Sequence, residues 1–378
     1  MIKIIKQKLT HRQDDPCYII DNKKTFSKFY ANLTAQNKCT TNDPNELWQY
    51  TKLENYINHT GTEPDIDIRE LYKKRAVQIR EQNEYVRIWA SGGADSTNVI
   101  HAFHNAGVQP DEIATYMQYP GAIHASQNAE VDFSLRPFLK EIKQWWPNVK
   151  IKFYNVLPEH YHWYSKNAVE HFTAYTQLHP PAFSWQIAYE VYPELQEHSA
   201  KYQTANIYSG PDFSIGVDKN GWYYRFVDKS YNDALNAPYQ IFFYATPEAK
   251  DLWLKIVHRA KKHILKTAED TSIPFEDQIL GEWGIKTGGL SEMEFWLPES
   301  IEFGRKKNKA NWSGILNYGP KGSLRFHNMI SSVTGETTLL NFLHYYKEVN
   351  NKYPHWFNNN NIMEDWIGIR TKKIYFEK

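Results

Sequence analysis

Cysteine is nearly absent from this chain. Its 378 residues include two, Cys17 and Cys39, which both lie near the start of the sequence and lack metal-ligand spacing. We therefore expect neither a disulfide-stabilised scaffold nor a zinc site built on cysteines.

Long apolar runs are missing as well. No stretch approaches the roughly 20 apolar residues that span a bilayer. The start, residues 1–6, is too short and too charged for a signal peptide. We therefore expect a soluble, cytoplasmic protein with no membrane partner.

The chain also lacks an excess of charge of one sign, since 44 Lys and Arg face 43 Asp and Glu. Proteins that bind long nucleic acids usually carry a basic excess. Nucleic acid is therefore an alternative partner but not the favoured one. Hydrophobic residues make up 41% of the chain, which is enough for a sizeable core.

Apolar strand patterns alternate with helical patterns in the middle of the chain. Helical stripes follow the first two strand patterns, and Pro247 opens a later helix. The predicted strands are 85–90, 112–117, 150–156, 205–208, 222–227 and 240–244. This alternation favours an α/β fold with a parallel, doubly wound, Rossmann-like sheet. Ligands of such sheets bind where the strands end.

Three regions follow from this pattern. Residues 1–75 are polar and irregular, and we expect an N-terminal extension. Residues 76–268 form the predicted α/β domain. Residues 269–378 form a C-terminal mixed α/β region that selects the substrate or is accessory.

The segment Ser91–Ser96, with sequence SGGADS, lies between the first predicted strand and its helix. Gly92 and Gly93 let the backbone approach an anion and adopt positive φ, and the helix directs its N-terminal N–H groups to the same place. The Ser91 and Ser96 hydroxyls add donors. Asp95 would be repelled by a polyphosphate unless it holds Mg²⁺ or orients a backbone amide or a water molecule. The alternative is that the segment binds no ligand and is an ordinary tight turn that caps the helix.

This strand–SGGxDS–helix arrangement resembles the PP-loop motif of the ATP pyrophosphatase superfamily, whose fold is of the HUP type. The superfamily includes the synthetase domain of asparagine synthetase and 7-cyano-7-deazaguanine synthase. The motif matches at five positions, and the order of elements is similar over roughly residues 80–230. No Walker-A pattern is present, so a P-loop kinase or GTPase is not expected.

The resemblance implies an AMP-forming ligase with ATP and Mg²⁺ as cofactors. Such enzymes adenylate an acceptor oxygen, release pyrophosphate, and let a nucleophile displace AMP. Asp95 would serve in catalysis and as a metal ligand, beside the ATP-binding Ser91, Gly92, Gly93 and Ser96.

Further site residues follow from the order of elements in the superfamily. Met117 and Gln118, after the second strand, would cradle adenine. Gly210, after the fourth strand, would close the pocket, and Asp212 would be a second metal ligand. A cation near the α-phosphate would complete the site, and Lys321 is favoured because flanking glycines permit close approach. The alternative cations are Arg225, Lys286, Arg305 and Arg325.

The scarcity of cysteines reduces the number of reactions that the protein could catalyse. No cysteine follows residue 39, so sulfur transfer through a persulfide has no evident carrier. We therefore expect an amine, ammonia or an amino acid as the nucleophile. A nucleobase or tRNA modification enzyme of the same superfamily and a non-catalytic ATP-binding regulatory protein stay as alternatives. The acceptor and the oligomeric state remain open.

Overall fold

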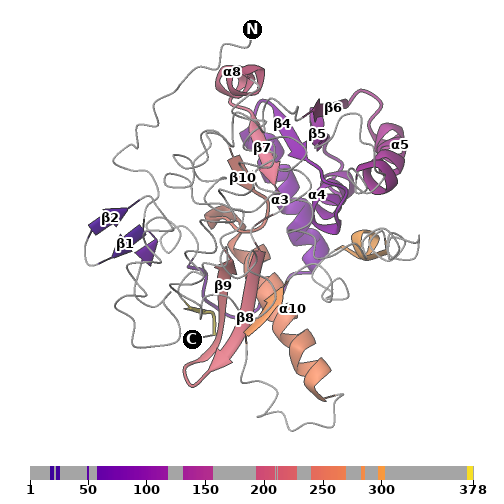
Figure 1. Ribbon diagram of the computed structural model, residues 1–378. Helices are drawn as coiled ribbons and strands as arrows, with labels where there is room; N and C mark the ends of the chain where they lie inside the picture. Colours follow the sequence, from indigo (N-terminus) through magenta and orange to yellow (C-terminus); the bar gives the residue numbers. More distant parts are fainter. Residues whose placement is uncertain are drawn as a thin grey trace, which may run out of the picture.

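The computed structural model describes the middle of the chain most fully (Figure 1). The described residues are 18–20, 23–25, 49–50, 58–117, 131–155, 193–208, 210, 212–227, 240–269, 282–285, 297–302 and 373–377.

A five-stranded parallel sheet forms the centre of the described structure. Its strands, in chain order, are β4 (Val86–Trp89), β5 (Glu112–Met117), β6 (Lys150–Asn155), β7 (Ala205–Tyr208) and β10 (Gln240–Phe242). Their order in the sheet is β10-β7-β4-β5-β6. The chain thus moves outward from β4 to β6 and then returns to the other side of β4. The strand order reverses between β4 and β7, and the predicted parallel α/β sheet is confirmed.

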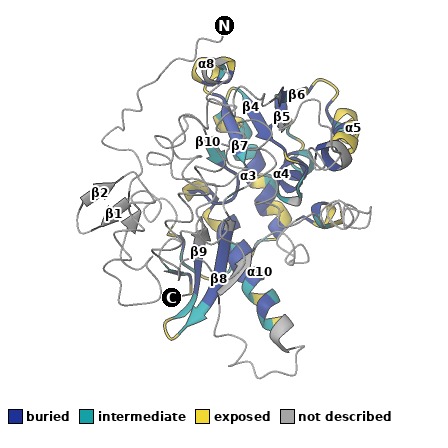
Figure 2. Cartoon of the chain, viewed as in Figure 1, coloured by how far each residue is buried: buried dark blue, intermediate teal, exposed yellow. Residues whose placement is uncertain are grey.

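Helices pack against this sheet on different faces. The helices are α3 (Ile68–Gln82), α4 (Ala94–Asn105), α5 (Arg136–Trp145) and α8 (Pro193–Tyr202). Val86 and Ile88 of β4 belong to the core that also contains residues of α3, α4 and α5, whereas Trp89 packs with Leu195 of α8. Figure 2 shows that the central strands β4 and β7 are mainly buried, while α5 and α8 carry exposed residues. Residues 156–192, which connect β6 to α8, lie outside the described residues, so the doubly wound arrangement stays a prediction.

Helix α3 crosses the predicted boundary at residue 75. Its buried side is Ile68, Leu71, Tyr72, Arg75, Ala76 and Ile79. The Arg75 guanidinium is tolerated there because it donates to the carbonyl oxygens of Phe243 (2.8 Å) and Phe242 (3.2 Å) and to the Thr246 hydroxyl (3.0 Å). Arg75 thereby ties α3 to the end of β10.

An antiparallel sheet accompanies the parallel one. Its order is β11-β8-β9-β12, formed by β8 (Asp212–Asp218), β9 (Gly221–Val227), β11 (Glu282–Ile285) and β12 (Ile374–Tyr375). Strands from both sides of the predicted boundary at residue 268 therefore share one sheet. A smaller sheet joins β1 (Tyr18–Ile20), β2 (Lys23–Thr25) and β3 (Gln49–Tyr50) within the predicted N-terminal extension.

The helix predicted at Pro247 begins as the 3₁₀ turn η3 (Pro247–Ala249) and continues as α10 (Lys250–Glu269). Its predicted apolar face is buried at every position, namely Leu252, Ile256, Val257, Ala260 and Ile264. Within the described ranges, no helix combines the length and apolar character needed to cross a bilayer.

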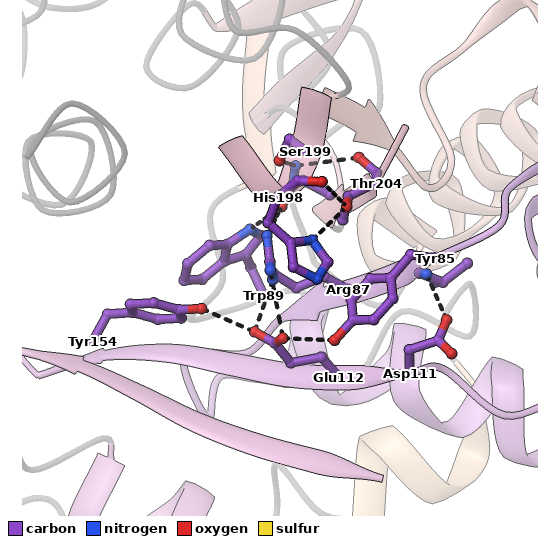
Figure 3. A network of polar contacts seen from close by, with 11 residues as sticks. Tyr85, Arg87, Trp89, Asp111, Glu112, Tyr154, His198, Ser199 and Thr204 are labelled. Carbon is purple, nitrogen blue, oxygen red and sulfur yellow. Dashed lines mark hydrogen bonds and ion pairs between the residues drawn. The ribbon is translucent and has the colours of Figure 1, made fainter. Parts of the chain in front are cut away.

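A polar row crosses the sheet on the face that α8 covers (Figure 3). Arg87 of β4 is in register with Glu112 of β5 and with Asn206 of β7. Arg87 and Glu112 form an ion pair at 2.8 Å, and both side chains are 1% exposed. The Asn206 side-chain oxygen accepts hydrogen bonds from Arg87 (3.1 Å) and from the Trp89 indole (3.2 Å). Buried polar atoms that are bonded in this way fix the alignment of the three central strands.

Candidate functional site

The Ser91–Ser96 loop lies at the carboxyl edge of the parallel sheet, directly after β4. Both neighbours of β4, which are β5 and β7, run parallel to it and end at the same edge. In open α/β sheets, ligands bind outside this edge, at the place where the strand order reverses. That place falls between β4 and β7, so the topology puts the loop at the expected ligand site.

The two glycines have the backbone geometry that an anion cradle requires. Gly92 has φ of 84°, a left-handed conformation that other residues rarely adopt. Gly93 is the N-cap of α4, with φ of −79° and ψ of 166°. A Cβ atom added to Gly93 would lie 3.2 Å from the Ser91 Oγ and would crowd the loop. The conformation of Gly92 therefore favours glycine, whereas a Cβ at Gly93 would require the exposed Ser91 hydroxyl to shift by a few tenths of an ångström.

Hydrogen bonds inside the loop hold its shape. The Ser96 hydroxyl accepts from the Ser91 N–H (3.3 Å) and donates to the Gly93 carbonyl (3.2 Å). The Thr97 hydroxyl donates to the same carbonyl at 2.8 Å. Ser96 is buried and Ser91 is exposed. In this structure the Ser96 hydroxyl stabilises the loop through its hydrogen bonds to the loop backbone. Its role as a hydrogen-bond donor to a phosphate stays a prediction.

The N-terminus of α4 faces the loop with its positive dipole end. Among the described residues, no side chain caps this helix end. Asp95 lies in the first turn and is partly exposed. The charge of Asp95 also affects a buried group. Burial raises the pKa of the Tyr72 hydroxyl, a hydrogen bond with Asn98 lowers it, and the negative charge of Asp95 raises it further.

The loop fits a magnesium–polyphosphate ligand. Mg²⁺ in nucleotide sites is held by one or two carboxylates together with phosphate oxygens. Asp95 would supply one such carboxylate if the site holds the metal. The part of the chain that the structure describes contains no cluster of three or more potential metal-ligand side chains. Asp212 begins β8, where its backbone pairs with Val227.

The other predicted site residues are placed as follows. Met117 is the last residue of β5 and pairs with Asn155 of β6, so it ends at the same edge as the loop. Arg225 lies in β9 and is buried. Outside the described residues are Gln118, Lys286, Arg305, Lys321 and Arg325.

Gly210 lies two residues beyond β7, and a packing contact explains its identity. A Cβ atom at this position would be 2.1 Å from the Tyr244 ring, in the segment that follows β10. The Tyr244 ring in turn stacks on Trp253, with ring centroids 6.2 Å apart. The aromatic core therefore requires glycine here, whether or not Gly210 also contacts a nucleotide.

Gly210→Ala should lower the free energy of unfolding by about 1–3 kcal/mol, because the added methyl group overpacks the core against Tyr244. Denaturant unfolding measures this loss. A double-mutant cycle with Tyr244→Leu is the control: the smaller side chain makes room, so the two losses should not add. Additive losses would contradict the packing account.

Sequence reasoning missed Ser134. It lies in the π-helical turn η2 (Val131–Leu135), and its hydroxyl donates to the Gly92 carbonyl at 2.6 Å. The bond joins residues 42 positions apart in the chain. A lone serine before a helix carries no signal that would reveal such a contact.

Comparison with family models and with curated proteins finds no match. Among solved structures, the chain is similar to the NMN synthetase from Francisella tularensis, with 12% sequence identity and a TM-score of 0.28. The match covers 71% of this chain and 94% of that chain.

Proposed function

We propose that this protein binds Mg²⁺-ATP at the Ser91–Ser96 loop and cleaves it to AMP and pyrophosphate. The single observation that carries the proposal is the position of the loop. Gly92, in a left-handed conformation, and the N-terminus of α4 meet at the carboxyl edge where the strand order reverses. This arrangement gives a polyphosphate backbone N–H donors and a favourable dipole together.

The reaction that suits the site is adenylation of an acceptor oxygen with release of pyrophosphate. An amine, ammonia or an amino acid then attacks the carbon that bears this oxygen and displaces AMP. Asp95 would hold Mg²⁺, and the metal would neutralise charge on the departing pyrophosphate. The N–H groups of the loop would hold the phosphates in place during transfer. Lys321 is our proposal for the cation at the α-phosphate. The resemblance of the loop to the PP-loop motif supports the same reaction.

The test is a calorimetric titration of the protein with ATP, followed by a pyrophosphate-release screen over candidate acceptors. We expect ATP to bind in the presence of Mg²⁺ and more weakly when the metal is chelated, because Asp95 and the phosphates repel one another without it. We expect pyrophosphate release to require an acceptor. GTP is the control ligand in the titration. Failure of ATP to bind would refute the proposal.

Two outcomes of the screen would favour the alternatives. ATP binding without pyrophosphate release for any acceptor would favour a non-catalytic regulatory protein. Release that depends on RNA and weakens steeply with salt would favour a nucleic-acid modification enzyme.

A further inference from the structure

The peptide unit between Gly92 and Gly93 is held from the buried side of the loop. Ser134 is 4% exposed, and its Oγ lies 2.6 Å from the Gly92 carbonyl oxygen, to which it donates. This distance is at the short end of the range for hydroxyl donors. The bond therefore fixes the direction in which the Gly92 carbonyl points.

The direction of that carbonyl determines the direction of the next N–H group. In a trans peptide the C=O and N–H bonds point to opposite sides. With the Gly92 carbonyl turned inward to Ser134, the Gly93 N–H faces the other way. It donates at 3.2 Å to the hydroxyl of Ser91, which is exposed. The Gly93 donor thus lies on the accessible side of the loop, where a phosphate oxygen would take the place of the Ser91 hydroxyl as its acceptor.

Two adjacent glycines make this orientation easy to lose. Neither residue has a side chain to restrict rotation, so the peptide plane between them can flip at little steric cost. A flipped plane would turn the Gly92 carbonyl oxygen toward the ligand, and its partial negative charge would repel a phosphate. The flexibility that lets the loop approach an anion therefore also requires a contact that holds this peptide in one orientation.

Ser134, which makes this contact, lies in an unusual local structure. Ser134 is the fourth residue of η2, which continues directly into α5. π-Helical turns are rare and are frequent at functional sites. We propose that Ser134 is a positioning residue that holds the Gly92–Gly93 peptide with its N–H toward the phosphates of ATP. This inference rests on the proposed function.

The test compares ligands that differ in their phosphates. Ser134→Ala should weaken the binding of Mg²⁺-ATP and of inorganic pyrophosphate by about 10- to 100-fold, the effect of losing one oriented donor to an anion. AMP, which lacks the β- and γ-phosphates, should bind with unchanged affinity. Ser134→Thr retains the hydroxyl and should retain most of the affinity for pyrophosphate.

Ser199→Ala is the matched control. Ser199 is also a buried serine, and its hydroxyl accepts a hydrogen bond from Asn206 at 3.2 Å, but it lies on α8, on the other face of the sheet. Its truncation should leave pyrophosphate affinity unchanged within about twofold. If the alanine variant at Ser134 fails to fold, Ser134→Cys gives the same comparison with a weak donor of similar size.

The outcomes separate the inference from the proposed function. Unchanged pyrophosphate affinity in Ser134→Ala, or an equal loss for AMP and pyrophosphate, would overturn the positioning role. If the unmodified protein binds neither ATP nor pyrophosphate, the proposed function fails instead. A crystal structure of Ser134→Ala then decides the inference: a flipped Gly92–Gly93 peptide supports it, and an unchanged peptide overturns it.

Discussion

Glu112→Ala should lower the free energy of unfolding by about 3–5 kcal/mol, the usual cost of removing one partner of a buried ion pair. Glu112 accepts hydrogen bonds from Arg87 (2.8 Å) and from the hydroxyls of Tyr85 (2.9 Å) and Tyr154 (3.1 Å) (Figure 3). Without this carboxylate, the Arg87 charge stays buried and loses its ion-pair partner. Urea denaturation of the two proteins measures the difference.

The pH dependence of the same difference provides a second measurement. Burial alone would raise the pKa of Glu112, but the Arg87 charge and the hydrogen bonds from Arg87 and Tyr85 outweigh it, so the pKa lies below its usual value. A lowered native pKa stabilises the fold above the unfolded-state pKa of about 4.3 and loses that stabilisation as the pH falls through the native value. The advantage of the unmodified protein over Glu112→Ala should therefore shrink in acid.

The ion pair between Glu70 and Lys73 is the matched control, because its atoms are also 2.8 Å apart while its side chains are 54% and 38% exposed. Glu70→Ala should cost less than about 1 kcal/mol. The double variant Arg87→Met/Glu112→Leu should recover much of the loss, since it leaves no charge unpaired. Equal losses for Glu70→Ala and Glu112→Ala would show that burial does not decide the energy of this pair.

The parallel sheet was predictable because its signals are local. Strands 112–117 and 205–208 were predicted to the residue, since each is a short run of strand-forming residues next to loop signals. Helix α3 was missed because Arg75 interrupts its apolar stripe. In a sequence, an arginine indicates a surface position. Arg75 is buried because it donates hydrogen bonds to the carbonyl oxygens of Phe242 and Phe243. Those oxygens lie more than 160 positions away in the sequence.

In the candidate site, too, the features set by neighbouring residues were predictable, and the contacts between distant segments were not. The Ser91–Ser96 loop was predictable because glycine conformation and helix capping act over a few residues. Strand β8 was not predicted: Asp212, expected as a metal ligand after the fourth strand, already pairs with Val227 of β9. Ser134 was also missed, because its partner is chosen by the packing of η2 against the loop. Contacts between distant segments need the fold before they can be recognised.

Asp95→Asn should reduce pyrophosphate release by about 100-fold or more, if Asp95 holds the metal as we propose. The substitution keeps the shape of the side chain and removes its charge, so Mg²⁺ would lose an anionic ligand. Metal stabilisation of a transition state contributes several kcal/mol, and each 1.36 kcal/mol changes the rate about tenfold. Pyrophosphate release is measured with the acceptor found in the screen, over a range of Mg²⁺ concentrations. High Mg²⁺ should restore part of the rate.

The matched control is Asp251→Asn. Asp251 is an exposed carboxylate in the first turn of α10, just as Asp95 lies in the first turn of α4, so both substitutions remove one favourable contact with a helix dipole. The two variants should therefore lose similar, small amounts of stability, and only Asp95→Asn should lose activity. Full pyrophosphate release by Asp95→Asn would remove Asp95 from catalysis. Equal loss of activity in both variants would mean that the helix termini, and not the metal, account for the effect.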